Sequence, residues 1–271
     1  MPSPNVSDME VRLFPNSTRP GVGQRPRRES QRPLLPQHAR HCPVLEAGSE
    51  VGFFVYAPLA ENEAFRIEYE GEGQYRFTFY MGALGADWQP LFSVLIAMPI
   101  GGVGSMKEEV TMHVPNTPIS PEGARRMARI FIVPEDLGTP AGAVSLRGAT
   151  NFQTPPGWDT VYTSVFNSIE RPVAPMLVVR VETDWFAHDT EFRYVLQPGE
   201  GIHTSHTLPI GQVFFVPREE VTFRDCTEEE VAAITASKNA FFREKAALTL
   251  ATPYGLQYSP HYARKSRASK S

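Results

Sequence analysis

Apolar and polar residues alternate in two consecutive stretches of the chain, residues 65–70 and 74–80. A period of two is typical of a strand that buries one face. Gly71, Glu72 and Gly73 separate the two stretches, and glycine permits the positive φ angles that a tight turn needs. The pattern therefore predicts a β-hairpin over residues 65–80.

Further strands are predicted where apolar residues run between turn residues. Residues 51–57 form one such run, which ends at Pro58. The apolar run over residues 92–98 ends at Pro99 and lacks alternation, which fits a strand buried on both faces, with a short buried helix as the alternative. Four later segments also have strand character: residues 161–166, 176–185, 191–196 and 211–216.

Two helices are predicted from the residues that begin them. Ser120, Pro121 and Glu122 supply an N-cap, a proline at the first helical position and an early acid, ahead of a short helix that carries residues 124–128. Thr227 and Glu230 form a capping box ahead of a longer helix over residues 228–248. The apolar residues of this longer helix recur near one face: Val231, Ile234, Phe241 and Phe242.

Many short strands with one or two peripheral helices predict a mainly β fold, either a β-sandwich or a jelly-roll-like domain. The expected organisation has four parts: a disordered Pro/Arg-rich arm over residues 1–36, a β-sandwich domain over 37–226, a C-terminal helix over 227–250 packed on or beside the domain, and a basic flexible tail over 251–271. The arm is expected to be disordered because it has seven prolines and little periodic hydrophobicity.

The formal net charge of −4 is unevenly distributed along the 271 residues. Residues 1–40 carry seven Arg and three acids, which is +4, and residues 263–271 carry four basic residues and no acid, which is another +4. Subtracting both from −4 leaves −12 for the middle of the chain. Because the middle of the chain is this acidic, we expect no nucleic-acid binding except weak binding through the basic tails. No apolar run approaches the roughly 20 residues that span a bilayer, so no membrane role is expected.

The two cysteines, Cys42 and Cys226, are too few for the disulfide framework of a typical small secreted domain. The N-terminus also lacks a basic region followed by an apolar stretch, so no signal peptide is indicated. We therefore expect a cytoplasmic protein with both thiols reduced, and a Cys42–Cys226 disulfide is the alternative.

Two motifs and a closing strand give the sequence a distinctive character. They are Thr154-Pro-Pro-Gly-Trp158, Val181-Glu-Thr-Asp-Trp185 and Leu208-Pro-Ile-Gly-Gln-Val-Phe-Phe-Val-Pro-Arg218. With Asn167 between the motifs and an Arg40–Leu45 opening, this order resembles an uncharacterised bacterial domain-of-unknown-function family with TPPGY, VETDW and G-x-P…P-x-R motifs. The resemblance spans roughly residues 38–222. The segment from His203 to His206 departs from it. The resemblance implies a domain and supplies no mechanism.

Asp184 and Glu182 are the candidate catalytic residues. Residues two apart on a strand project to the same face, and carboxylates at strand ends often line pockets. Such a pair could bind a substrate or a metal. The alternative is structural: an Asp at a strand-to-turn junction commonly caps the backbone of the turn.

His203, His206 and His188 are the candidate metal ligands. His203 and His206 form an H-x-x-H pair, and His188 or Asp184 could complete the set. Two histidines and a carboxylate on a β-scaffold make the site of non-haem Fe(II) oxygenases, so Fe(II) or another divalent metal is the possible cofactor. Against a metal site, residues 201–209 read as an exposed turn, where histidines are usually solvated.

The candidates for substrate binding are Trp158, Asn167, Trp185 and Arg218. With Tyr162 and Phe166, the two tryptophans could line a pocket for an apolar or aromatic ligand, although the same pattern is expected for a sandwich core.

Two functions from different classes follow. The first is a cytoplasmic enzyme that modifies a small molecule or a peptide in a pocket of the sandwich, with a non-haem metal as a possible helper. The second is a non-catalytic binding or assembly module that recruits a partner or forms a homo-oligomer, with the acidic body facing the basic tails of another copy.

Overall fold

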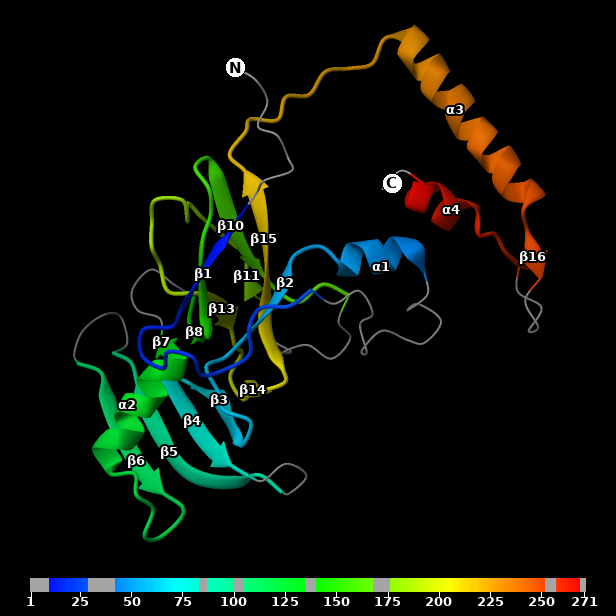
Figure 1. Cartoon of the computed structure of the whole chain (residues 1–271). Helices are drawn as coiled ribbons and strands as arrows, with labels where there is room; N and C mark the ends of the chain where they lie inside the picture. The colour runs from blue at the N-terminus through cyan, green and yellow to red at the C-terminus, as the bar shows by residue number, and fades with distance from the viewer. Residues whose placement is uncertain are drawn as a thin grey trace. The chain divides into compact units, whose positions relative to one another are not determined.

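The computed structural model describes residues 10–28, 42–82, 87–99, 105–134, 140–167, 176–251 and 257–268. Strands dominate, and every strand pairing within these residues is antiparallel (Figure 1). The chain divides into two compact units. One comprises Met1–Arg40 with Leu45–Arg218, and the other comprises His41–Val44 with Glu219–Ser271. The first unit therefore ends eight residues before the boundary predicted at 226.

The predicted hairpin lies at the centre of a five-stranded sheet in the first unit. Its strands run in the order β14 (Gly201–Ser205), β3 (Glu63–Gly71), β4 (Gln74–Met81), β5 (Gln89–Ala97) and β6 (Lys107–Met112). The turn between β3 and β4 has φ angles of 98°, 49° and 74° at Gly71, Glu72 and Gly73. The hairpin and the strand predicted over 92–98 are confirmed.

Helix α2 (Pro121–Phe131) covers one face of this sheet (Figure 1). The Ser120 side chain accepts a hydrogen bond from the Gly123 backbone N–H at 3.1 Å, as the sequence predicts for an N-cap. Phe131 is fully buried, with its ring centroid 5.2 Å from that of Phe65 and 5.7 Å from that of Phe79. This aromatic cluster holds the helix on the sheet.

Two four-stranded sheets also belong to the first unit. One has the order β12 (Val179–Val181), β10 (Trp158–Thr163), β15 (Pro209–Pro217) and β2 (Phe53–Tyr56), and the other has the order β11 (Met176–Leu177), β13 (Glu191–Val195), β8 (Ala143–Arg147) and β7 (Ile132–Pro134).

These two sheets pack against each other through β15, β10 and β13. A side chain at Gly211 would overlap the Phe192 ring, and Tyr194 donates a hydrogen bond to the Ile210 carbonyl at 2.8 Å. Tyr162 meets Phe192 edge to face at 5.7 Å between centroids. The packed antiparallel sheets agree with the predicted sandwich.

The prediction that residues 1–36 form a disordered arm is wrong for residues 10–28. Strand β1 (Arg12–Pro15) pairs with β9 (Thr150–Gln153). Arg19 forms a bidentate ion pair with Glu63, with distances of 2.7 and 3.0 Å. Further on, Arg27 forms a backbone bridge with Phe54. Strand hydrogen bonds and a mostly buried ion pair order this segment, and neither appears as local hydrophobic periodicity. Residues 1–9 and 29–36 lie outside the described residues.

The second unit contains the predicted long helix, α3 (Glu228–Ala247), with both hydrogen bonds of the Thr227–Glu230 capping box present. No α3 residue is buried within this structure, and three residues of the predicted apolar face are more than half exposed: Val231, Ile234 and Phe242.

The tail predicted to be flexible after residue 250 instead contains helix α4 (His261–Ala268). Lys265 forms an ion pair with Glu244 of α3 at 2.8 Å, and the His261 ring lies 4.9 Å from the Phe241 ring. The short strands β16 (Leu250–Ala251) and β17 (Gln257–Tyr258) precede it. None of the helices within the described residues has the length and apolar character needed to cross a membrane.

Candidate functional site

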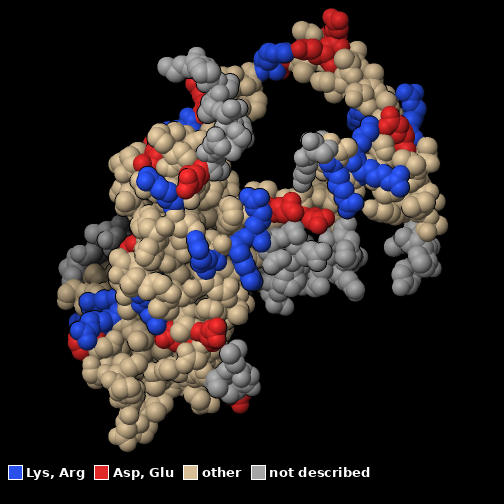
Figure 2. All heavy atoms as spheres, viewed as in Figure 1, with Lys and Arg blue, Asp and Glu red and all other residues tan. Residues whose placement is uncertain are grey.

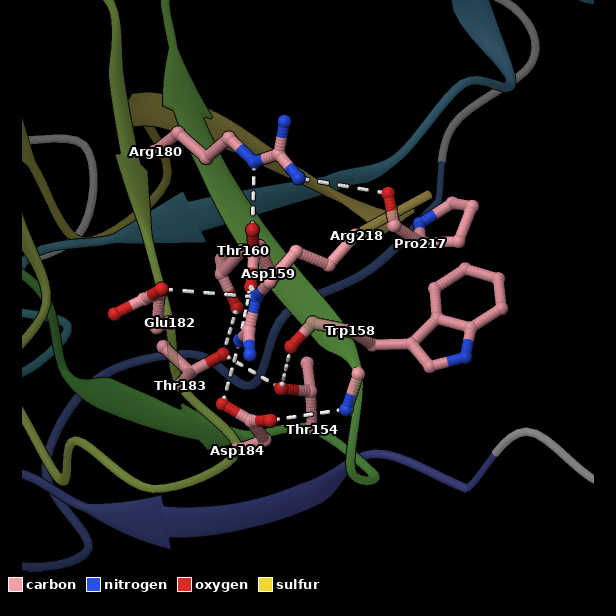
Figure 3. A network of polar contacts seen from close by, with 11 residues as sticks. Thr154, Trp158, Asp159, Thr160, Arg180, Glu182, Thr183, Asp184, Pro217 and Arg218 are labelled. Carbon is pink, nitrogen blue, oxygen red and sulfur yellow. Dashed lines mark hydrogen bonds and ion pairs between the residues drawn. The ribbon is translucent and has the colours of Figure 1, made fainter. Parts of the chain in front are cut away.

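The three distinctive motifs of the sequence converge on one ionic network at the end of β15 (Figure 3). Asp159, at the start of β10, is 2% exposed. Its Oδ1 accepts from Arg218 Nε at 2.9 Å, and its Oδ2 accepts from Arg180 Nε at 2.6 Å. Chain segments around residues 159, 180 and 218 are thus joined by one buried carboxylate.

Asp184 lies on the other side of the Arg218 guanidinium. Arg218 Nη2 donates to Asp184 Oδ1 at 2.7 Å, and the Gly157 backbone N–H donates to Asp184 Oδ2 at 2.9 Å. The Arg218 hydrogen bond, followed by that from Gly157, lowers the pKa of Asp184. The pKa of Asp159 is also lowered, chiefly by its hydrogen bond from Arg218. A carboxylate with a lowered pKa is a weak general base at neutral pH.

Glu182, the other predicted catalytic residue, is at the rim of the same network. Its carboxylate lies 3.7 Å from Arg218 Nε, and its side chain is 49% exposed. The structure therefore brings Asp184 and Glu182 together with Arg218, which the sequence analysis names only as a candidate for substrate binding. The arrangement holds Asp184 as the cap of the Thr154–Trp158 turn, which is the structural alternative that the sequence left open.

A buried chain of hydroxyl groups lies beside the ionic network. Thr183 Oγ1 is 2.9 Å from Thr154 Oγ1 and 2.7 Å from Thr160 Oγ1. Thr154 also donates to the Trp158 carbonyl at 2.6 Å, across its own turn. These contacts fasten the turn to β10 and to the segment after β12, so this part of the site is held rigidly.

The stability of this network should depend on pH. Because the folded-state pKa values of Asp159 and Asp184 are lowered, the folded state binds fewer protons than the unfolded state near pH 4. Their contribution should be complete above the ordinary carboxyl pKa of about 4 and should disappear as pH falls through the folded-state values. Urea unfolding of the wild type and Asp184→Asn from pH 7 to pH 3 should show the two stabilities converging as pH falls. A constant difference between them would contradict this.

The predicted aromatic pocket is not assembled. Trp185 is 67% exposed and its ring lies tilted against that of Phe186, whereas Tyr162 is buried in the core and Trp158 is half-buried. Trp185 is therefore not part of the sandwich core either. Trp185 lies four residues after Val181, the last residue of β12, on an exposed turn that strand alternation alone does not reveal.

Asn167 has a different position from the one expected of a substrate-binding residue. Its φ angle is 54°, and its Nδ2 donates to the Leu45 carbonyl and to Ser49 Oγ, both at 3.1 Å. Both partners belong to helix α1 (Pro43–Ser49). Asn167 therefore fastens the end of that helix to the sandwich.

The three histidines are not brought together as metal ligands. His203 lies in strand β14, opposite Arg66 of β3, so residues 201–205 of the predicted exposed turn are a paired strand, and residues 206–208 form the turn. His206 Nδ1 lies 2.7 Å from the Leu59 carbonyl, and His188 packs on the Phe186 ring. No group of three or more His, Cys, Asp or Glu side chains within the described residues is placed to hold a metal. Both cysteines, Cys42 and Cys226, are free.

A cavity of about 490 Å³ lies between the β1–β9 pair and strands β2 and β15, on a different part of the first unit from the ionic network. Its wall is mostly apolar and includes Val11, Leu13, Phe53, Phe152, Phe214 and Phe215. The Phe215 ring centroid lies 5.8 Å from that of Phe152 and 6.0 Å from that of Phe53.

Sequence reasoning missed this cavity because four of its ten described lining residues belong to the arm expected to be disordered: Val11, Leu13, Pro26 and Arg28. The available signals were Val11 and Leu13, which are spaced two apart, and the adjacent pair Phe214 and Phe215 in a predicted strand. Gly52 also lines the cavity; its φ is 77°, and a side chain there would collide with the Val213 carbonyl.

Among the described residues that line the cavity, Arg28 has the one charged side chain. Its guanidinium carbon lies 4.8 Å from the Phe53 ring centroid, within the range of a cation–π contact. Within the described part of the chain, no carboxylate forms an ion pair with Arg28.

Comparisons of the chain with protein-family models, curated proteins and solved structures found no match. The resemblance to the bacterial family with TPPGY and VETDW motifs therefore stays a prediction.

Proposed function

We propose that the protein is a binding module that holds a small apolar molecule in the cavity between β1, β9, β2 and β15. The observation that carries this proposal is the cavity itself. Its volume of about 490 Å³ lies within the roughly 300–1,000 Å³ of small-molecule sites, and a mostly apolar wall with one polar group is typical of such sites.

The ionic network favours a binding function over a catalytic one. Asp159 and Asp184 are held by arginine side chains and a backbone N–H, and neither lines the cavity. The catalytic function of Asp184 and Glu182 that the sequence suggests therefore stays a prediction. A carboxylate that already accepts a charge-assisted hydrogen bond would have to lose it before acting on a substrate.

The test is binding of a neutral apolar fluorophore, N-phenyl-1-naphthylamine, to the full-length chain. Leu13→Trp should fill part of the cavity and weaken binding about tenfold or more, because small steric changes in apolar pockets have effects of this size. The matched control is Leu177→Trp. Leu13 and Leu177 are strand leucines with 40% and 39% exposure, and Leu177 does not line the cavity.

Saturable binding that Leu13→Trp weakens and Leu177→Trp leaves within about twofold of the wild type would support the proposal. Absence of saturable binding to the wild type, or an equal loss in both variants, would overturn it. Circular dichroism of each variant would show that the fold is retained.

A further inference from the structure

The single charged residue in the wall of the cavity indicates more about its ligand than the apolar residues do. Resting on the proposed binding function, we propose that the ligand is an amphiphile whose anionic head, a carboxylate or a phosphate, is bound by Arg28 while its apolar body occupies the cavity.

The backbone places Arg28 at this wall. The preceding residue, Arg27, forms an antiparallel bridge with Phe54, with N···O distances of 3.3 and 2.8 Å. This bridge joins the arm to the end of β2, where Phe53 lies under the Arg28 guanidinium. Cation–π contact with Phe53 orients the planar group and leaves its N–H donors for another partner.

The charge environment of Arg28 differs from that of the ion-paired arginines among the described residues. In the first unit, a group of arginines form ion pairs with carboxylates: Arg19, Arg66, Arg76, Arg129, Arg147 and Arg218. Figure 2 shows one face of the molecule, on which Lys and Arg side chains lie beside Asp or Glu in several places. By contrast, no carboxylate of the described residues pairs with Arg25, Arg27 or Arg28.

The Arg28 guanidinium therefore gives its side of the cavity wall a positive charge that no ion pair within the described residues neutralises. A guanidinium beside an apolar wall favours an anion in two ways: it forms bidentate hydrogen bonds to a carboxylate or a phosphate, and the low local dielectric strengthens them. An amine head would be repelled, and an alcohol head would accept a single hydrogen bond from the guanidinium without pairing its charge. The charge complementarity therefore selects an anionic amphiphile.

The experiment measures displacement of N-phenyl-1-naphthylamine by four ten-carbon ligands: decanoate, decyl phosphate, 1-decanol and decylamine. We expect at least one of the two anions to bind about tenfold more tightly than decanol, the increment of a charge-assisted hydrogen bond. Decylamine should bind more weakly than decanol. The ratio of the two anion affinities distinguishes a carboxylate ligand from a phosphate ligand.

Arg28→Gln should reduce the anion-to-alcohol affinity ratio to about one. The ratio is measured within each variant, so general damage to the cavity does not imitate this result. Arg25→Gln is the matched control, because Arg25 is an exposed arginine of the same segment that does not line the cavity, and it should retain most of the preference.

If the neutral probe binds but no anion binds better than decanol, the head-group inference is overturned and the binding function stands. If the Arg28→Gln variant still bound the anions more tightly than decanol, the inference would also be overturned. If the neutral probe does not bind at all, the proposed binding function itself fails.

Discussion

Replacing Phe131 with alanine is expected to lower the free energy of unfolding by about 3–5 kcal/mol, the usual cost of removing a buried phenylalanine ring. Phe131 is completely buried, and its ring contacts three phenylalanines of the five-stranded sheet: Phe65, Phe77 and Phe79. The sheet strands are held by their hydrogen bonds and cannot close over the space left by the ring, so a cavity remains.

The Arg19 guanidinium also lies 5.6 Å from the Phe131 ring centroid, so the substitution removes one contact of the N-terminal arm. Urea unfolding followed by circular dichroism would measure the change. Phe186→Ala is a suitable control because Phe186 is 46% exposed, and its loss should change stability by about 0.5 kcal/mol or less. Similar losses in the two variants would contradict the packing described for α2.

Asp159→Asn is expected to have the second largest effect, a loss of about 2–3 kcal/mol, in the range for hydrogen bonds to charged groups. The amide has nearly the same volume as the carboxylate, so packing is preserved. It carries no charge, and it offers only one acceptor oxygen where Arg218 and Arg180 together need two. One arginine would then face an amide N–H donor. Both arginines are partly exposed and can regain water, which limits the loss.

The control for Asp159→Asn is Glu182→Gln. Glu182 approaches the same Arg218 at 3.7 Å, but its side chain is 49% exposed, and pairs of this kind contribute about 1 kcal/mol or less. Urea unfolding of the two variants at pH 7 should therefore separate the buried carboxylate from the exposed one. If Glu182→Gln destabilised the protein as much as Asp159→Asn, the central role given to Asp159 would be wrong.

More of the ionic network than of the cavity could be predicted from the sequence. Motif positions pointed to Asp184, Glu182 and Arg218, and these residues do meet. Their central partner, Asp159, was missed because an acid directly after Trp158 at the start of a strand has no local signal of burial. It is buried only because Arg218, 59 residues later in the chain, supplies a counter-charge.

Local signals were sufficient for much of the secondary structure. Period-two alternation with a glycine turn predicted β3 and β4, and the N-caps Ser120 and Thr227 predicted the starts of α2 and α3. Each signal acts over a few residues, since a turn, a cap or a buried strand face is determined by its own neighbours. The mainly β class followed from the number of such segments.

Only the tertiary structure determines the contacts between distant parts of the chain. Leu13 lies opposite Phe152 in the β1–β9 pairing, and this contact both orders the N-terminal arm and closes the cavity. The same applies to the histidines: β14 pairs with β3, and the pairing places His203 opposite Arg66 rather than beside another ligand. Strand pairing depends on which backbone edges meet in the folded chain, and hydrophobic periodicity within a segment carries no information about its distant partner.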